Sequence, residues 1–428
     1  MLKALVSAFR TPDLRRKLLF TIMIMAIYRL GTYVPAPFVS YENVKQCLSE
    51  QGTADIFTML NMFSGGAMLQ ISVFALGIMP YITASIIVQL MRVVIPKFEE
   101  LHKEGQTGTA KLTEYTRYLT IFLAVLQASV MVSIANGKLF TTCSVHPIPG
   151  ATPLRLVVAI IAITAGTGLI MWLGELITER GVGNGMSLLI FTGIAANFPA
   201  MLTNVFRSDG GAARVAIVVA MFLAITLVVV FVEQSQRRIP VQYAKRVIGR
   251  RTYGGTSTYI PLKINMANVI PVIFASSILS LPQMIAQFGD PNSSWVQWLH
   301  LHFTRASVWY LIAYALLIVF FAFFYTSITF NPEEVADNMK RYGGFIPGIR
   351  AGQPTADYLR YVINRINWVG ALYLAIIAMI PLVVFNQMGI RSMAFGGTSI
   401  IILVGVGLQT VKDIDAQLQQ RHYEGFLR

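Results

Sequence analysis

The side chains that most often carry catalysis or bind metals are few in this sequence and form no known motif. The five histidines, at positions 102, 146, 300, 302 and 422, fall in predicted loops or in the C-terminal tail, without the HExxH spacing of a zinc site. Neither a GxxxxGK[ST] phosphate loop nor a GxSxG elbow occurs. We therefore predict no catalytic residue, no metal site and no cofactor, and the sequence does not favour an enzyme.

Charged residues are also nearly absent from the middle of the predicted membrane spans. Arg29 lies close to the outer end of its span, whereas Glu175 and Glu233 lie at the inner ends of theirs. An ion-coupled carrier needs carboxylates or histidines that face its interior, because a charge inside the membrane is costly and is kept only for function. The pattern argues against such a carrier.

The apolar stretch from Phe74 to Gln89 carries Gly77 and Pro80 within a predicted span. Because proline has no N–H, the carbonyl of Leu76 would lose its helical partner. Broken backbone at membrane depth is tolerated only where protein or a water-filled cavity satisfies it. Two interpretations stay open: a helix broken beside a pore, or a proline-kinked helix that merely packs against its neighbours.

The elements that must position these residues are membrane-spanning helices. Of the 428 residues, 55% are hydrophobic and only 13% are charged. A hydrocarbon core about 30 Å thick needs roughly 20 apolar residues per crossing. The sequence therefore predicts an all-α integral membrane protein, with ten transmembrane helices near 18–34, 71–91, 116–135, 153–175, 184–202, 213–233, 266–288, 306–328, 366–388 and 393–411.

The distribution of positive charge predicts the orientation. Placing the N-terminus in the cytoplasm puts most of the 34 Lys and Arg residues in cytoplasmic segments, and with ten spans the C-terminus is cytoplasmic as well. Cys47 and Cys143 then both lie outside, as one disulfide or, the favoured interpretation, as two unpaired thiols.

Ten spans divide into two sets of five, and an odd number per half means that the second half enters the membrane with inverted orientation. We expect an amphipathic cytoplasmic segment at 1–17, an N-terminal half at 18–202, a C-terminal half at 203–411 and a cytoplasmic tail at 412–428. The same inverted repeat would suit a secondary solute transporter, which is the alternative function.

Two long cytoplasmic loops, 234–265 and 331–365, have ordered patterns. In the first loop, residues typical of strands alternate with other residues in two stretches, which predicts the two strands of a hairpin. The basic tip of this hairpin would stand about 30 Å from the membrane, beyond a Debye length of about 8 Å. We favour RNA phosphate or protein carboxylates over anionic lipid as the partner of this tip. The second loop predicts a helix from Asn331 to about Arg341, followed by Arg350 in a turn between Gly348 and Gly352.

Several long segments of the chain resemble the SecY family, the channel subunits of the bacterial protein translocase. The resemblance covers nearly the whole chain, and the segments that carry it are 63–67 (FSGGA), 74–82 (FALGIMPYI), 172–185 (WLGELITERGVGNG), 243–246 (YAKR), 331–332 (NP), 345–350 (FIPGIR) and 395–399 (FGGTS). It implies an hourglass-shaped central pore for unfolded secretory polypeptides, which also releases membrane segments sideways into the bilayer.

The resemblance also implies roles for individual residues. Five waist isoleucines would form the pore ring, a segment at 57–70 would be the plug, and small or polar side chains would line a lateral gate between the second and seventh spans. The waist isoleucines are Ile78, Ile82, Ile190, Ile273 and Ile402; the plug includes Phe63, Ser64, Gly65 and Gly66; the gate residues are Thr83, Ser85, Gln127, Ser276 and Ser277; and the docking residues for a motor or the ribosome are Arg237, Arg238, Lys245, Arg246, Arg250, Arg251 and Arg350.

The implied partners are SecE-like and SecG-like small membrane subunits, the SecA motor ATPase, the ribosome, signal sequences, unfolded polypeptides and membrane lipids. The implied location is the bacterial cytoplasmic membrane. Individually, each waist isoleucine would be an ordinary core or lipid-facing residue, and only the resemblance selects these five.

Overall fold

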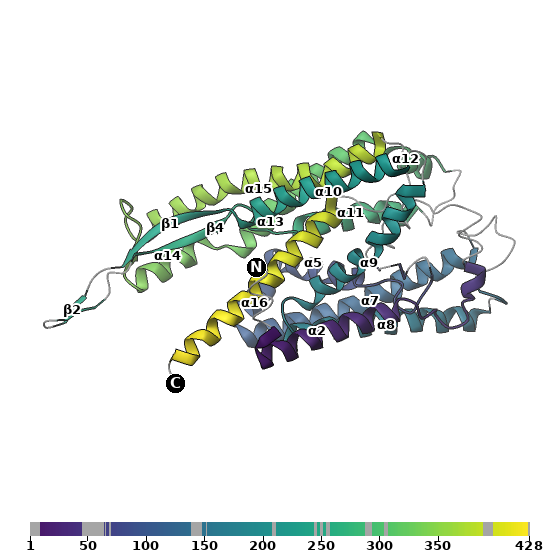
Figure 1. Cartoon of the computed structure of the whole chain (residues 1–428), viewed down its shortest axis with the longest axis horizontal. Coiled ribbons are helices and arrows are strands. Elements are labelled where there is room, and N and C mark those ends of the chain that lie inside the picture. The colour runs from purple at the N-terminus through teal and green to yellow at the C-terminus, as the bar shows by residue number, and fades with distance from the viewer. Residues whose placement is uncertain are drawn as a thin grey trace.

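The computed structural model describes residues 9–44, 64, 66–67, 70–137, 148–150, 152–207, 211–243, 246–248, 251–253, 257–286, 293–303, 307–387 and 397–426. Helices dominate these residues (Figure 1). Their bounds are α2 Pro12–Gly31, α5 Met79–Val94, α6 Pro96–Lys103, α7 Gln106–Gly137, α8 Pro153–Arg180, α9 Gly185–Arg207, α10 Gly211–Gln234, α11 Ile270–Ala286, α12 Ser294–His302, α13 Val308–Thr329, α14 Pro332–Arg341, α15 Gln353–Gln387 and α16 Gly397–Phe426.

Each of the ten predicted spans overlaps one of these helices. Among the described residues, six helices (α7, α8, α10, α13, α15 and α16) are long and apolar enough to cross a membrane, and α5 with α6, bent by 97°, gives a seventh. The helices α9 and α11 are apolar but shorter. Several helices continue past the predicted spans: α15 begins at Gln353 inside the expected loop, and α16 runs through most of the expected tail.

The predicted second span is wrong in its first part, because α5 begins only at Met79. Pro80 lies in the first turn of α5, where a missing N–H costs nothing, and Gly77 has a φ of +56° in the turn before it. The expected break inside a helix is therefore a helix start. Instead of continuing the helix, Val73 donates to the Val34 carbonyl at 2.9 Å, and Gly166 of α8 lets this segment approach closely.

The described helices pack in two groups that follow the chain. The helices α2, α5, α7, α8 and α9 contact one another, and so do α10, α11, α13, α15 and α16. The two groups meet where α9 contacts α10 and α16, and where α5 contacts α11. Figure 1 shows the two groups as separate layers, with α16 of the second group running obliquely to both.

The predicted hairpin is confirmed. Strand β1 (Gln236–Tyr243) pairs antiparallel with β4 (Ser257–Lys263), and the shorter strands β2 (Arg246–Ile248) and β3 (Arg251–Tyr253) pair beyond them. Strand β5 (Gly344–Phe345) adds to the free edge of β1. In Figure 1 this sheet projects from one end of the helices, with α14 beside it.

The predicted short helix after Asn331 is confirmed as α14. The Asn331 side chain accepts a hydrogen bond from the backbone N–H of Glu333 at 3.1 Å, and Pro332 occupies the first turn. The helix ends at Arg341, and Gly343 follows with a φ of +70°.

Candidate functional site: an isoleucine cluster between the two helix groups

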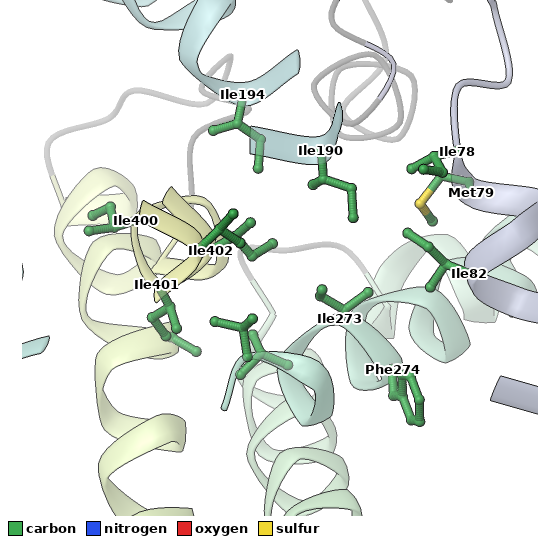
Figure 2. Packing of buried hydrophobic residues seen from close by; sticks show 14 of the residues in the cluster. Ile78, Met79, Ile82, Ile190, Ile194, Ile273, Phe274, Ile400, Ile401 and Ile402 are labelled. Atoms are coloured by element: carbon green, nitrogen blue, oxygen red, sulfur yellow. The ribbon is translucent and has the colours of Figure 1, made fainter. Parts of the chain in front are cut away.

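The five waist isoleucines all lie in one buried cluster. Their exposed fractions are 1% for Ile78, 9% for Ile82, 4% for Ile190, 8% for Ile273 and 0% for Ile402. They come from positions that are far apart in the sequence: the start of α5, and the helices α9, α11 and α16. Figure 2 shows these side chains converging on one region between the helices.

The backbone around the start of α5 explains two of these positions. Ile78 is the residue before the helix, and its carbonyl accepts from the N–H of Ile82 at 3.1 Å, so the two side chains lie one turn apart. Branched aliphatic side chains offer water and ions no hydrogen bonds, so a pore lined by such side chains would disfavour both by dewetting.

The structure also places isoleucines in this cluster that the sequence analysis did not select. Ile194 lies one turn after Ile190, and Ile400 and Ile401 precede Ile402; all three are buried and appear in Figure 2. The four-residue spacing of Ile190 and Ile194 was the available signal for the first of these.

The predicted plug is described only in part. Ser64 is buried at 1% exposure, and Gly66 has a φ of +96°, which favours glycine. A Cβ atom at Gly66 would lie 3.6 Å from Oδ1 of Asn197, so this residue is close to α9. Phe63 and Gly65 lie outside the described residues.

The predicted gate residues lie on helices that contact each other, since α5 packs against α11. Ser276 and Ser277 are buried on α11, and Thr83 and Ser85 are half-buried on α5. Thr83 donates to the Met79 carbonyl at 3.0 Å and Ser276 to the Ile273 carbonyl at 2.8 Å, so both hydroxyls bond within their own helix.

The remaining gate residue, Gln127, is half-buried on α7, a helix that packs against α5. Nearer the end of α5, Gln89 donates to Ser85 at 3.3 Å. Thr83, Ser85 and Ser276 are thus small side chains that are hydrogen-bonded within their own helices, as suits close helix packing in lipid.

The predicted docking residues lie on the projecting sheet and beside it. Arg237 and Arg238 are exposed on β1, and the Arg238 guanidinium lies 4.8 Å from the centre of the Tyr259 ring. Arg246 pairs in register with Tyr253, and Arg251 with Ile248. Lys245 and Arg250 lie outside the described residues.

Arg350 is exposed in a turn that the backbone holds in place. Gly348 and Gly352 on either side have φ values of +84° and +103°, and Thr355 donates to the Arg350 carbonyl at 2.9 Å. Because β5 pairs with Gln242 and Tyr243, this turn is tied to the far end of β1.

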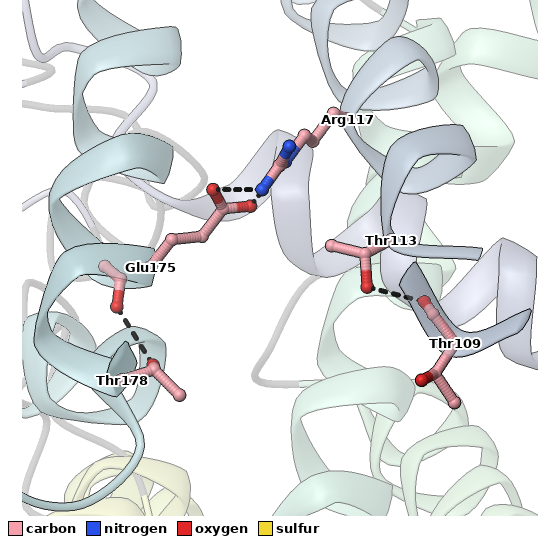
Figure 3. A network of polar contacts seen from close by, with 6 residues as sticks. Thr109, Thr113, Arg117, Glu175 and Thr178 are labelled. Carbon is pink, nitrogen blue, oxygen red and sulfur yellow. Dashed lines mark hydrogen bonds and ion pairs between the residues drawn. The ribbon is translucent and has the colours of Figure 1, made fainter. Parts of the chain in front are cut away.

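The sequence analysis missed an ion pair between two of the long helices. Arg117 of α7 donates through Nε and Nη2 to the two carboxylate oxygens of Glu175 on α8, both at 2.8 Å (Figure 3). A bidentate guanidinium–carboxylate pair fixes orientation as well as distance. It joins α7 to α8, which also pack against each other along their length.

The fold is that of a multi-span membrane protein whose two helix groups meet at a buried isoleucine cluster, with arginines exposed on a sheet at one end. The family model described as SecY matches residues 72–411. The chain is 59% identical over 437 residues to a protein translocase subunit SecY from Streptomyces galbus, and 54% identical over 443 residues to one from Mycobacterium tuberculosis, covering 100% of both chains in each case. The chain belongs to the SecY family.

Solved structures show the same fold. A structure described as that of a protein conducting channel matches with a TM-score of 0.63 and 19% identity, over 93% of this chain and 91% of the other. Sec61 in a canine ribosome-channel complex matches with a TM-score of 0.61 and 18% identity over the same shares. The protein is thus a multi-pass membrane protein and a protein-conducting channel, and the solute transporter alternative is not favoured.

Proposed function

We propose that the five waist isoleucines are the constriction through which unfolded secretory polypeptides cross the membrane. The observation that carries this assignment is their convergence, fully or almost fully buried, from helices of both groups. An aliphatic ring excludes ions when idle because it offers no hydrogen bonds. The ring can close around a passing chain without recognising its sequence, since contacts between apolar surfaces are non-directional.

The segment 57–70 would cover this constriction from the outer side, with Ser64 and Gly66 at its bend. The seam between α5 and α11 would be the lateral gate, through which apolar segments leave for the lipid. A signal sequence entering there gains about 0.8 kcal/mol per buried CH₂, which offsets separation of the two helices.

The projecting sheet and Arg350 would receive a cytoplasmic partner. Relatives of known structure were solved in ribosome complexes, namely canine Sec61 and yeast Ssh1. For this chain we propose the ribosome and a SecA-like motor as alternating partners of the same basic surface, and SecE-like and SecG-like subunits within the membrane. The membrane would be the bacterial cytoplasmic membrane, with both chain termini in the cytoplasm.

Reconstitution tests the proposal. The chain, co-purified with a SecE-like subunit and placed in vesicles, should make a precursor protease-resistant when SecA and ATP are added. Vesicles that hold the same complex without ATP are the control. Failure to protect the precursor, with the complex intact and SecA bound, would refute the assignment.

A further inference from the structure

A groove lies between α13 and α15, outside the isoleucine cluster and the α5–α11 seam. Its volume is about 650 Å³, within the range of small-molecule sites. One end is lined by the phenylalanines 320, 323 and 324 of α13, and the other by Pro332 of α14 and Arg360 of α15. The groove is therefore apolar at one end and polar at the other.

A buried asparagine lies between these two ends. Asn367 is 5% exposed, lines the groove and lies 3.0 Å from Oγ1 of Thr326, which is 3% exposed. Thr326 also contacts the Ala322 carbonyl at 2.8 Å. Whichever way the amide is turned, one of its two polar atoms meets Thr326, and the other has no hydrogen-bond partner within the part of the chain that the structure describes. The other end of the amide can therefore pair with a ligand that fills the groove.

The polarity of the groove matches the depth profile of one membrane leaflet. Helix α15 has 35 residues, about 52 Å, whereas the hydrocarbon core takes about 20 of them. Counting 20 residues back from the end of α15 at Gln387 places the hydrocarbon boundary near Trp368. The Trp368 side chain is 54% exposed and packs edge-on against Phe323, with 4.9 Å between the ring centres. Exposed tryptophan is typical of that boundary. Arg360 lies two turns further, about 10 Å into the headgroup layer.

Arg360 is the charged residue of the groove lining, and it is paired with two carboxylates that do not themselves line the groove. The Arg360 guanidinium donates to Glu333 at 2.9 Å and to Asp357 at 3.2 Å, so one cation is flanked by two carboxylates. A guanidinium has five N–H donors, and these two contacts leave others for an anion. Phosphate suits Arg360, and an ammonium suits the surplus carboxylate charge.

We propose that this groove binds one glycerophospholipid whose headgroup carries a primary ammonium beside its phosphate, as phosphatidylethanolamine does. The phosphate meets Arg360, and the ammonium meets Glu333 and Asp357. The glycerol ester region pairs with the free end of the Asn367 amide, and an acyl chain lies over Phe320 and Phe324. The lipid occupies the leaflet on the side of the hairpin.

Native mass spectrometry of the full complex tests this assignment. The complex is taken from nanodiscs that contain equal amounts of phosphatidylethanolamine and phosphatidylglycerol. One retained lipid per channel is expected, with phosphatidylethanolamine preferred at least threefold. Retention should fall at least fivefold in Arg360→Gln and in Asn367→Leu, and at least twofold in Phe320→Ala, whose side chain is 59% exposed. Arg365→Gln, an exposed position of α15 that does not line the groove, is the matched control and should retain lipid as the parent does.

The double variant Glu333→Gln with Asp357→Asn separates the headgroups. It removes the partners of the ammonium and leaves Arg360, so the preference should move to phosphatidylglycerol. Equal retention in the parent, Arg360→Gln and Phe320→Ala would overturn the site. An unchanged headgroup preference in the double variant would show that Glu333 and Asp357 do not bind the ammonium. A groove filled by a helix of a partner subunit would show that no lipid binds there.

Discussion

Asn265 donates a hydrogen bond from Nδ2 to Oε1 of Glu233 at 2.6 Å, and both side chains are buried, with exposed fractions of 2% and 8%. The same Nδ2 also lies 3.1 Å from the Asn268 carbonyl. This contact ties the segment that leads from β4 into α11 to the end of α10. Lys412 of α16 donates to the Glu233 backbone carbonyl at 3.3 Å, so α10, α16 and the segment before α11 meet at one polar point.

We predict that Asn265→Ala destabilises the protein by about 2–4 kcal/mol, because it leaves a buried carboxylate without its amide donor. The midpoint of thermal unfolding of the purified complex measures the effect. Gln234→Ala, at the exposed neighbour of Glu233, is the matched control and should change little. Equal midpoints for Asn265→Ala and the parent would show that the pair contributes nothing.

The waist prediction concerns ion leakage. Ile78→Asn combined with Ile273→Asn places two hydrogen-bonding side chains in the apolar ring, which should wet and conduct chloride. Conductance of the purified complex in planar bilayers is the measurement. Ile78→Val with Ile273→Val keeps the ring apolar and should stay closed. If the asparagine double variant conducted no more chloride than the valine double variant, the assignment of these isoleucines to the pore ring would be wrong.

The gate prediction uses cysteines at Thr83 and Ser277. With Cys47 and Cys143 replaced, cysteines at this pair, or one turn away on either helix, should cross-link in the idle channel, because α5 and α11 are in contact. The closed link should block precursor entry, and a reductant should restore it. Single-cysteine variants are the controls. If efficient linkage left both secretion and helix insertion unaffected, the gate would lie elsewhere.

The docking prediction concerns Arg350. Arg350→Glu should reduce SecA-driven transport at least tenfold, because a hydrogen bond to a charged group is worth about 1.5–3 kcal/mol and reversal adds repulsion. Transport of a precursor into vesicles measures it. Arg341→Glu, an exposed arginine at the end of α14, is the control and should transport nearly as the parent does. Parental transport by folded Arg350→Glu would contradict the docking role.

The hairpin tip carries a separate docking prediction. Replacing Arg250 and Arg251 together with glutamate should weaken ribosome binding, and the loss should be largest at low salt, where the charges are least screened. Co-sedimentation over a salt series measures it. Arg237→Glu, which reverses one charge near the base of β1, is the comparison and should weaken ribosome binding less.

Much of this protein follows from its sequence alone, because the information is local. Apolar runs of about 20 residues predict spans, since the bilayer requires every backbone group to be satisfied within the segment. Alternation at Ile239 and Val241 predicted a strand, and Asn331 followed by Pro332 predicted a helix start. Both features depend only on neighbouring residues, and both are confirmed.

The tertiary structure decided what depends on residues far apart in the chain. Pro80 was expected inside a helix, which it would break or kink, but it begins one, because the preceding segment pairs with Val34 and packs against Gly166 instead of continuing the helix. The Asn265–Glu233 bond and the Arg117–Glu175 pair join positions 32 and 58 residues apart. No periodic pattern in the sequence predicts such pairs, since they form only when packing brings distant segments within hydrogen-bond distance.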